Sequence, residues 1–388
     1  MKPLSELLQN IPPSATLAVS DKAKALKAAG RDVISLAGGD PDFKTPENII
    51  QAALQALEAG DTHYPPSRGT VAMRQAVAAK MRRDYGLEVD PATQVLISAG
   101  AKFLIYAALS ALVNPGDEVI VFEPYWVSYV PIVIMTGATP VTVPLDPANG
   151  FAITDDVARY ITPRTKAIMV NSPNNPTGHV ISTEEAETVR RLALENDLYV
   201  ISDEIYEKLI FEGEHINLAS LPEMAERTIT INGHSKAYAM TGWRLGWAAG
   251  PKDVIGLMAK LQSQTVTSAA SFTMAAGAEA LNGPQDAVET MRLAYKARRD
   301  FMVDALNAIP GVACDPPAGA FYLFVRFPGL GSDSMQIADI LLEEADIAGT
   351  PGVAFGQSGE GHVRFSIATA MSELERAVVR IEKLMASR

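Results

Sequence analysis

The sequence predicts an α/β protein with a large domain, built on a mostly parallel central sheet flanked by helices, and a smaller α+β domain. Through the first two thirds of the chain, short apolar segments alternate with longer helical ones, as in parallel sheets covered by helices. From about Pro284 the pattern changes to a long charged helix, a strand and a terminal helix. The 388 residues suffice for two or three domains. We predict an N-terminal arm and part of the small domain in residues 1–46, the large domain in 47–283, and the rest of the small domain in 284–388.

The first part of the chain alternates helices with loops rich in glycine and proline. The loop AGGDPDFKTP contains Gly39, and its glycines indicate that the backbone approaches another group closely there. Thr45 followed by Pro46 predicts an N-cap and the first residue of a helix that runs to Glu58. A second loop, DTHYPPSRGT, contains Tyr64.

The large domain contains a series of predicted strands separated by helices. Ser182 and Glu185 have the spacing of a capping box, and the helix that follows leads directly into the strand LYVIS. Such a strand, helix and strand unit returns the chain parallel to itself. The residues that follow each strand therefore gather at one edge of the sheet. The strands predicted in this domain cover residues 95–98, 118–122, 167–171, 199–202 and 228–231.

Composition limits the class of protein. The net charge of -12 and the pI near 5.0 argue against nucleic acid or an anionic membrane as the main partner. A single cysteine, Cys314, excludes a disulfide framework and favours a reducing compartment. The N-terminus lacks the apolar core of a signal peptide, so we expect a cytoplasmic protein. The five histidines show no metal-ligand spacing, and no metal is expected.

Several chemically suggestive residues follow the predicted strands of the large domain, where ligands of open α/β sheets bind. In chain order they are Gly100, Ala101, Lys102, Trp126, Asn175, Asp203, Tyr206, Ser235, Lys236 and Arg244. A lysine in a loop is usually a solvated charge, but lysine also forms Schiff bases when its pKa is lowered. The cofactor most often built around such a lysine also needs a phosphate site and a carboxylate for its ring nitrogen.

The other residues at this edge match those needs. The turn ending at Ala101 opens a helix, so free backbone N–H groups suit a phosphate, to which Arg244 and Ser235 would add charge-assisted bonds. Asp203 ends a buried-looking strand, where a carboxylate is costly unless it is paired, and it would keep a pyridine nitrogen protonated. Trp126 offers a face on which such a ring stacks.

The motifs NSPNNPTG, SDEIYE, SKAYAMTGWRLGW and HVRFS occur in this order. Together with GGDPDF, they give the chain a resemblance, over nearly its whole length, to fold type I pyridoxal-phosphate enzymes. More closely, it resembles class I aminotransferases of the aspartate aminotransferase family. The resemblance implies a transaminase that uses pyridoxal 5'-phosphate, bound in the large domain, to move an amino group between an L-amino acid and a 2-oxo acid.

The resemblance also implies roles for single residues. Lys236 would be the Schiff-base lysine and proton shuttle, and Asp203 the partner of the pyridinium. Tyr206 and Asn175 would contact the phenolic oxygen and Trp126 the ring. The phosphate would lie near Gly100, Ala101, Lys102, Ser235 and Arg244. Arg364 would hold the substrate α-carboxylate, with Gly39, Asn175 and Trp126 close to the substrate. Tyr64 resembles a tyrosine that reaches the neighbouring subunit's phosphate, which implies a homodimer with shared sites.

The substrate is less well defined. One dicarboxylate branch of the family uses an arginine that is missing here, because residues 261–291 contain no basic side chain. Another branch uses a lysine after the glycine turn and a serine in a PSAT segment, which Lys102 and Ser14 match. Phe103, where that branch has glutamine, departs from its pattern. The alternatives are an aromatic or prephenate aminotransferase, a carbon–sulfur lyase and, outside enzymes, a ligand-sensing module, which the acidic pI disfavours.

Overall fold

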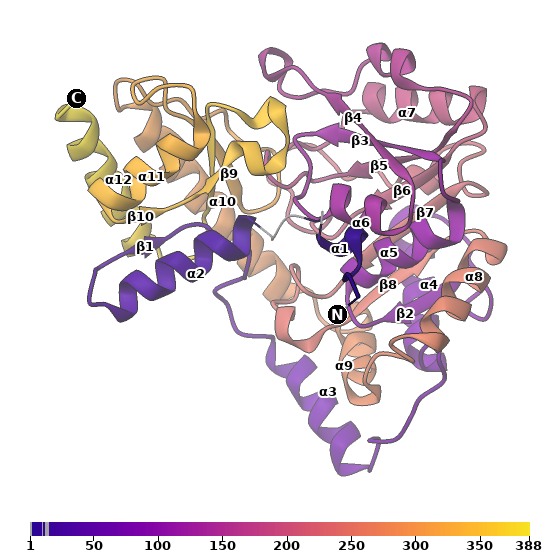
Figure 1. The fold of residues 1–388 in the computed structure, drawn as a ribbon. Coiled ribbons are helices and arrows are strands. Elements are labelled where there is room, and N and C mark those ends of the chain that lie inside the picture. The colour runs from indigo at the N-terminus through magenta and orange to yellow at the C-terminus, as the bar shows by residue number, and fades with distance from the viewer. Residues whose placement is uncertain (1, 10, 12–14) are drawn as a thin grey trace.

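A central sheet organises the larger part of the molecule (Figure 1). The computed structural model describes residues 2–9, 11 and 15–388. Within these residues the sheet has seven strands in the order β2-β8-β7-β6-β5-β3-β4. All neighbouring pairs are parallel except the two that β8 makes with β2 and β7. The strands are β2 (Val95–Ser98), β3 (Glu118–Glu123), β4 (Thr139–Pro144), β5 (Thr165–Asn171), β6 (Tyr199–Asp203), β7 (Thr228–Gly233) and β8 (Gly246–Ala249).

Helices cover both faces of this sheet. Alternate residues of a strand point to opposite faces, so Ile120 packs toward α7 while Val121 packs toward α5 and α8. Because both faces are buried, the strands are almost continuously apolar. The helices of the larger part are α3 (Glu47–Glu58), α4 (Val71–Tyr85), α5 (Ala101–Leu112), α6 (Tyr129–Met135), α7 (Thr183–Glu195), α8 (Lys252–Gln264) and α9 (Ser271–Asn282). None of the helices in the described residues is both long and apolar enough to cross a membrane.

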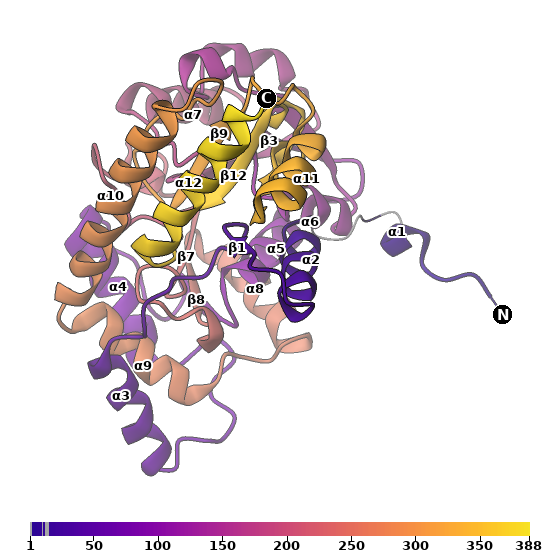
Figure 2. The same ribbon diagram turned by 90° about the vertical axis from the view of Figure 1, so that its left-hand side faces the viewer.

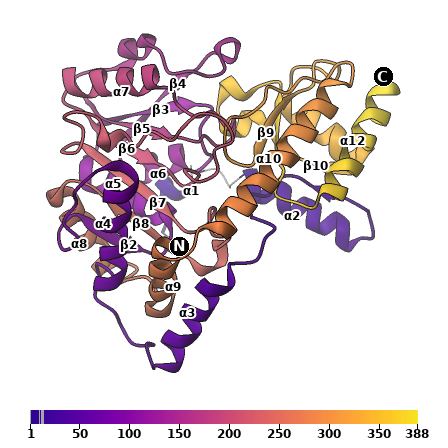
Figure 3. The same ribbon diagram turned by 180° about the vertical axis from the view of Figure 1, so that it is seen from behind.

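The smaller part combines the C-terminal third with an early segment of the chain. The long helix α10 (Asp286–Asn307) connects α9 to it (Figure 3). Its strands form a sheet of order β11-β12-β9, and β1 pairs in parallel with β10, Ile34 beside Ile347. This pairing supports our proposal that residues 1–46 and 284–388 form one small domain. The elements are α2 (Ala15–Ala28), β1 (Ile34–Ser35), β9 (Tyr322–Arg326), α11 (Ser334–Ala345), β10 (Ile347–Ala348), β11 (Thr350–Pro351), β12 (His362–Ser366) and α12 (Met371–Ala386). The short helix α1 (Glu6–Gln9) stands apart from both parts (Figure 2).

The predicted strands of the large domain are confirmed, but two further strands lie in the sheet. β4 forms one edge; its segment TPVTVP begins and ends near prolines, which edge strands tolerate. β8 has the sequence GWAA, without the β-branched residues that signal a strand. Because β8 is antiparallel, it begins at the edge where the parallel strands end. Arg244 therefore reaches the same edge as the residues that follow β5, β6 and β7.

Two predicted helix starts have different outcomes. The capping box at α7 is confirmed, with the Ser182 hydroxyl accepting from the Glu185 N–H and the Glu185 carboxylate accepting from the Ser182 N–H. The N-cap at Thr45 was wrong, because α3 begins at Glu47 with Pro46 as its N-cap. The Thr45 hydroxyl instead donates to the Ala239 carbonyl oxygen at 2.7 Å, across the sequence. A tertiary contact has replaced the local one.

Candidate active site

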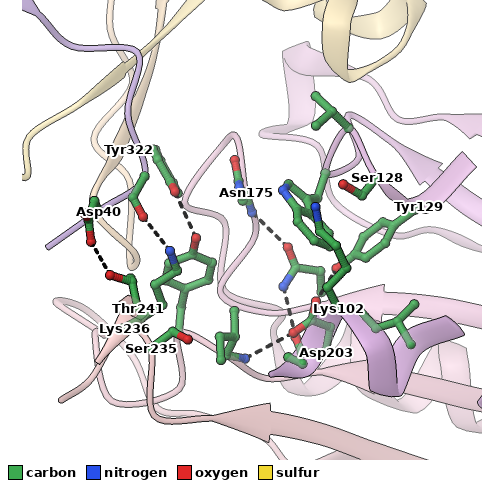
Figure 4. Close-up of a pocket in the computed structure, with 18 of the residues that line it drawn as sticks. Asp40, Lys102, Ser128, Tyr129, Asn175, Asp203, Ser235, Lys236, Thr241 and Tyr322 are labelled. Carbon is green, nitrogen blue, oxygen red and sulfur yellow. Dashed lines mark hydrogen bonds between the residues drawn. The ribbon is translucent and has the colours of Figure 1, made fainter. Parts of the chain in front are cut away.

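A cavity of about 370 Å³ opens at the carboxyl edge of the sheet, against the smaller part of the molecule (Figure 4). A volume of this size is typical of small-molecule sites. The loops after β3, β5, β6 and β7, the start of α5, and strands β9 and β12 of the smaller part contribute to it. It is lined by Gly39, Asp40, Ala101, Lys102, Ile105, Trp126, Val127, Ser128, Tyr129, Asn171, Asn175, Asp203, Ile205, Tyr206, Ser235, Lys236, Thr241, Arg244, Tyr322 and Arg364.

Asp203, the last residue of β6, places a buried carboxylate in the cavity wall. Tyr129 donates its hydroxyl hydrogen to Oδ2 of Asp203 at 2.6 Å, and the Ile205 N–H donates to Oδ1 at 3.3 Å. Burial raises the pKa of Asp203 to about 6, although the hydrogen bond from Tyr129 opposes that rise. The carboxylate is therefore mostly ionised at neutral pH and is available to a positively charged partner.

Lys236 lies beyond the end of β7 and directs its ammonium toward the cavity. Nζ donates to the carbonyl oxygen of Gly39 and lies 5.9 Å from the centre of the Tyr206 ring. Burial lowers the pKa of Lys236 to about 8, and the nearby Arg364 and Arg244 guanidinium groups contribute to the decrease. A neutral amine, which is the nucleophilic form, is therefore accessible near physiological pH.

Arg364 on β12 supplies a second buried cation. Its Nη1 donates to Oδ1 of Asn175 at 2.9 Å and its Nη2 to the Ala37 carbonyl oxygen at 2.6 Å. The guanidinium also lies 4.4 Å from the centre of the Tyr322 ring. Its Nε is buried and has no hydrogen-bond partner in the described part of the chain. The oxygens that these Nη atoms contact belong to neutral groups, and no carboxylate pairs with Arg364 among the described residues, so its positive charge is uncompensated and suited to an anionic ligand.

Two tyrosines close the wall between Lys236 and Arg364. The hydroxyls of Tyr206 and Tyr322 lie 2.9 Å apart, within hydrogen-bond distance, and their rings meet edge to face. Burial raises the pKa of both phenols, so both are protonated and can donate. A Cβ on Gly39 would lie only 2.5 Å from the Tyr322 hydroxyl, which is the close approach that its loop predicts.

The opposite end of the cavity is a cradle of backbone N–H groups and one guanidinium. Helix α5 begins at Ala101, and its N-cap, Gly100, provides no side chain to satisfy the free N–H groups. Gly100 has a φ of 99°, which favours glycine, and a Cβ there would lie 2.6 Å from Nη2 of Arg244. Arg244 itself has a φ of 54° and donates from Nη1 to the Thr241 carbonyl oxygen at 2.8 Å. These donors and the helix dipole make this end of the cavity suited to an anion.

Lys102 and Trp126 form the outer wall. The Lys102 ammonium lies 4.8 Å from the centre of the Trp126 ring, and Trp126 meets Tyr129 edge to face at 5.5 Å. Burial lowers the pKa of Lys102, and the charge of Arg244 lowers it further.

Comparison with known proteins agrees with this geometry. A model of the family "Aminotransferase class I and II" matches residues 31–381. The chain belongs to this family. It is 44% identical to an aspartate aminotransferase of Geobacillus stearothermophilus, with 99% of both chains covered, and 41% identical to an aromatic-amino-acid aminotransferase of Thermococcus litoralis, with 98% of both covered. The structure of a Thermus thermophilus aspartate aminotransferase with maleate superposes with a TM-score of 0.95 at 44% identity, covering 99% of this chain and 100% of that one.

The sequence-based prediction of a class I aminotransferase is therefore confirmed, and the protein is a transaminase. The aminotransferase brings most of the predicted site residues into one cavity. Those that line it are Gly39, Ala101, Lys102, Trp126, Asn175, Asp203, Tyr206, Ser235, Lys236, Arg244 and Arg364, with Gly100 directly behind Arg244.

Two predicted residues are not part of this cavity. Tyr64 is 92% exposed and lines a separate surface hollow with Val266 and Phe272. Within one chain, Tyr64 therefore does not line the proposed active-site cavity. Ser14 lies outside the described residues.

Sequence reasoning missed several residues of the aminotransferase cavity. Tyr129 is one turn after Trp126, and Tyr322 is in the strand AGAFYLFVRF; neither was predicted from the sequence as a site residue. Asp40 accepts from the Thr241 hydroxyl at 2.6 Å, joining the two loops beside Lys236. Of these residues, Asp40 was the one for which the sequence held a signal, because it directly follows Gly39 in a loop expected to approach another group closely.

Proposed function

We propose that this aminotransferase binds pyridoxal 5'-phosphate in the cavity through Lys236 and transfers amino groups between L-amino acids and 2-oxo acids. The observation that carries the proposal is the placement of Lys236, with a lowered pKa, in one cavity with a buried carboxylate and three further cations. When bound, the cofactor supplies an aldehyde carbon to which amines attach and a protonated ring that withdraws electrons from the substrate.

The residues present fit this group. The glycine cradle at Gly100, with Arg244 beside it, suits a phosphate, and Ser235 and the N-terminus of α5 would complete that site. Asp203 suits a protonated ring nitrogen, because its carboxylate is buried and directed into the cavity. The amide of Asn175 and the hydroxyl of Tyr206 would donate to the phenolic oxygen. Trp126 offers the ring a face, and Ala101 and Lys102 would lie near the phosphate.

The chain's own groups would then perform the proton transfers. Nζ of Lys236, once neutral, takes the proton from the substrate α-carbon and returns it to a neighbouring carbon as a general acid. Arg364 holds the substrate α-carboxylate through a guanidinium that no carboxylate occupies, and so orients the bond that is broken. Gly39 keeps the wall open beside the Tyr322 hydroxyl.

We further propose that the amino donor is an acidic amino acid such as aspartate or glutamate. Lys102 supports this, since its ammonium rests on Trp126 and pairs with no carboxylate in the described residues. Ser14 stays a predicted contributor. The relatives named aspartate aminotransferase agree with this choice, whereas the aromatic aminotransferase of Thermococcus litoralis favours an aromatic donor as the second candidate.

A cytoplasmic homodimer with shared sites is part of the same proposal. The almost fully exposed ring of Tyr64 supports it, because an aromatic side chain that projects from a loop is suited to contact another subunit. The single cysteine, which is buried, fits a reducing compartment.

The test is a single-turnover measurement on the purified holoenzyme. Cofactor absorbance is followed after mixing with aspartate, glutamate, phenylalanine, tyrosine and, for lyase activity, cystathionine. We expect aspartate and glutamate to react fastest. A faster reaction with aromatic donors would support the second candidate, and thiol release from cystathionine would indicate a lyase. Absence of any spectral change with every amino acid would refute the proposed function.

A further inference from the structure

A group of charged side chains lies buried directly behind the Asp203 turn, outside the cavity. We call Lys80, Glu204, Glu207 and His215 the buried ion cluster. Their side chains are 2%, 1%, 7% and 9% exposed, respectively. Burying a charge costs free energy unless a group of opposite charge compensates it. The positive charges in the cluster are therefore expected to offset its negative ones.

Glu204 is the best-connected member. Its carboxylate accepts from the Ser202 hydroxyl at 2.8 Å, from Nδ2 of Asn217 at 2.9 Å and from Nε2 of His215 at 2.8 Å. His215 and Asn217 belong to the loop before the short helix at Leu218–Ser220. This loop therefore holds the residue that follows Asp203.

Glu207 is held from the other side by helix α4. The Lys80 ammonium contacts Glu207 and Asp84 at 2.7 Å each, and Lys208 contacts Asp84 at 2.9 Å. Arg83, half exposed, pairs with Asp84 at the rim. The groups that face the His215 ring are thus Glu204, Glu207 and Lys80, together with the Tyr85 ring at 5.8 Å.

Asp84, the other carboxylate on Lys80, has Lys208 and Arg83 as cations of its own. With Asp84 compensated in this way, the charges of the four cluster members balance when His215 is protonated. Glu204 and Glu207 carry two negative charges, and Lys80 carries one positive charge. A second positive charge is available from a protonated His215. Burial lowers the pKa of His215, but the carboxylates of Glu204 and Glu207 outweigh burial and leave that pKa above its ordinary value.

The cluster and the cavity meet at one peptide unit. Asp203 and Glu204 are consecutive at the end of a strand, so one side chain faces the cavity and the other faces the cluster. The Glu204 N–H donates to the Ile231 carbonyl oxygen at 2.8 Å, and Nδ2 of Asn171 donates to the Asp203 carbonyl oxygen at 2.9 Å, which fixes this unit. The charge of Glu204 also raises the pKa of Asp203.

We propose that Glu204 and His215 form a positioning pair for Asp203, in which the imidazolium of His215 cancels the charge of Glu204 directly behind the cofactor-facing carboxylate. The pair rests on the proposed function, since it acts on the partner of the cofactor ring. Without the imidazolium, the negative charge of Glu204 makes Asp203 hold its proton more tightly. The carboxylate then ionises at a higher pH.

A divalent cation is the alternative source of positive charge. Ligand atoms of Glu204, Glu207 and His215 lie within 4.8 Å of one another. The Lys80 ammonium, however, already contacts Glu207 and occupies the place of a cation there. We therefore assign the balancing charge to the proton on His215.

The first test measures the affinity for pyridoxal 5'-phosphate as a function of pH, using fluorescence quenching of wild type, His215→Gln, Glu204→Gln and the double variant. Glutamine keeps a donor toward Glu204 but carries no charge. We expect His215→Gln to move the acid midpoint of binding upward by about one pH unit, and Glu204→Gln to move it downward. The double variant should match Glu204→Gln, because His215 acts through Glu204. Glu214→Gln, on the same loop but exposed, is the matched control and should leave the midpoint unchanged.

The second test uses the cofactor-free protein and does not depend on the proposed function. Because the folded-state pKa of His215 is raised, its stabilising charge is fully present below the ordinary pKa of about 6.5 and is lost as the pH rises through the folded value. The difference in Tm between wild type and His215→Gln should therefore be largest in acid and shrink toward alkaline pH. A merely structural hydrogen bond would give a constant difference.

The outcomes separate the two proposals. If wild type does not bind the cofactor at any pH, the proposed function fails and the positioning role fails with it. If binding is normal but the variants share one midpoint, only the positioning pair is refuted. A midpoint that shifts after dialysis against a chelator would show that a metal, not the His215 proton, balances Glu204. Opposite shifts with a pH-dependent Tm difference would support the pair.

Discussion

The cavity and the buried ion cluster lie on opposite sides of the same turn, yet they treat their charges differently. In the cluster, Lys80 contacts two carboxylates and Glu204 accepts from three side chains. In the cavity, Arg364 and Lys102 pair with no carboxylate among the described residues. Paired buried charges hold structure in place, whereas unpaired ones, fixed in advance, are suited to an anionic ligand.

This contrast shows that the partners of a buried charge indicate its role: a paired charge stabilises the fold, and an unpaired one is suited to bind a ligand. Substitutions in the cavity should reduce activity and spare folding, because removing an unpaired cation relieves repulsion. Substitutions in the cluster should reduce stability, because they leave a buried charge without its partner. The following changes are designed to separate these two effects.

The largest effect is expected for Lys236→Ala, which removes the only proposed carrier of the α-proton. Transamination should fall by about 10⁴-fold, while the protein stays folded. Single-turnover absorbance and a thermal melt measure the two quantities. Lys260→Ala, which changes an exposed lysine, serves as the control and should keep full activity. Wild-type turnover by the Lys236 variant would contradict the assignment.

Next in size is Lys80→Ala, on the other side of the turn. It leaves Glu207 buried without its cation, so the free energy of unfolding should decrease by about 3–5 kcal/mol. Denaturant titration of the cofactor-free protein measures this. Lys24→Ala breaks an exposed pair with Asp21 and should cost less than about 1 kcal/mol. Equal decreases in the free energy of unfolding for the two variants would contradict the claim that the cluster charges stabilise the fold.

Arg364→Lys should have a smaller, purely functional effect. Lysine keeps the charge but loses the planar fork that binds a carboxylate through two bonds. We expect kcat/KM to fall roughly thirtyfold, equivalent to about 2 kcal/mol, with unchanged Tm. The control is Arg326→Lys, an exposed position on the neighbouring strand β9. A drop in Tm as large as that of Lys80→Ala would place Arg364 among the structural charges.

Lys102→Ala should have the smallest effect, and a selective one. If Lys102 binds a distal carboxylate, kcat/KM for aspartate should fall roughly tenfold while that for phenylalanine stays the same or rises. Steady-state kinetics with both donors measure the ratio. Equal losses for both donors would mean that Lys102 serves the cofactor phosphate and does not select the substrate.

Much of this contrast could be predicted from the sequence, and the rest depended on contacts between distant segments. The strands before Asp203 and Lys236 were predictable because buried parallel strands are continuously apolar. Strand β8 lacks that pattern, so the sequence could not show that an antiparallel strand begins just after Arg244 and places it at the cavity edge. The roles of Tyr129 and His215 were hidden as well, because their carboxylate partners, Asp203 and Glu204, lie elsewhere in the chain.

The central claim is that the unpaired cations hold pyridoxal 5'-phosphate with Lys236 as its attachment point. The most direct measurement is to load the purified protein with the cofactor, reduce it with borohydride and map the modified peptide by mass spectrometry. The predicted result is one pyridoxyl group per chain, on the peptide that contains Lys236, and none in Lys236→Ala. A pyridoxyl group on Lys102 or another lysine, with Lys236 unmodified, would contradict the account.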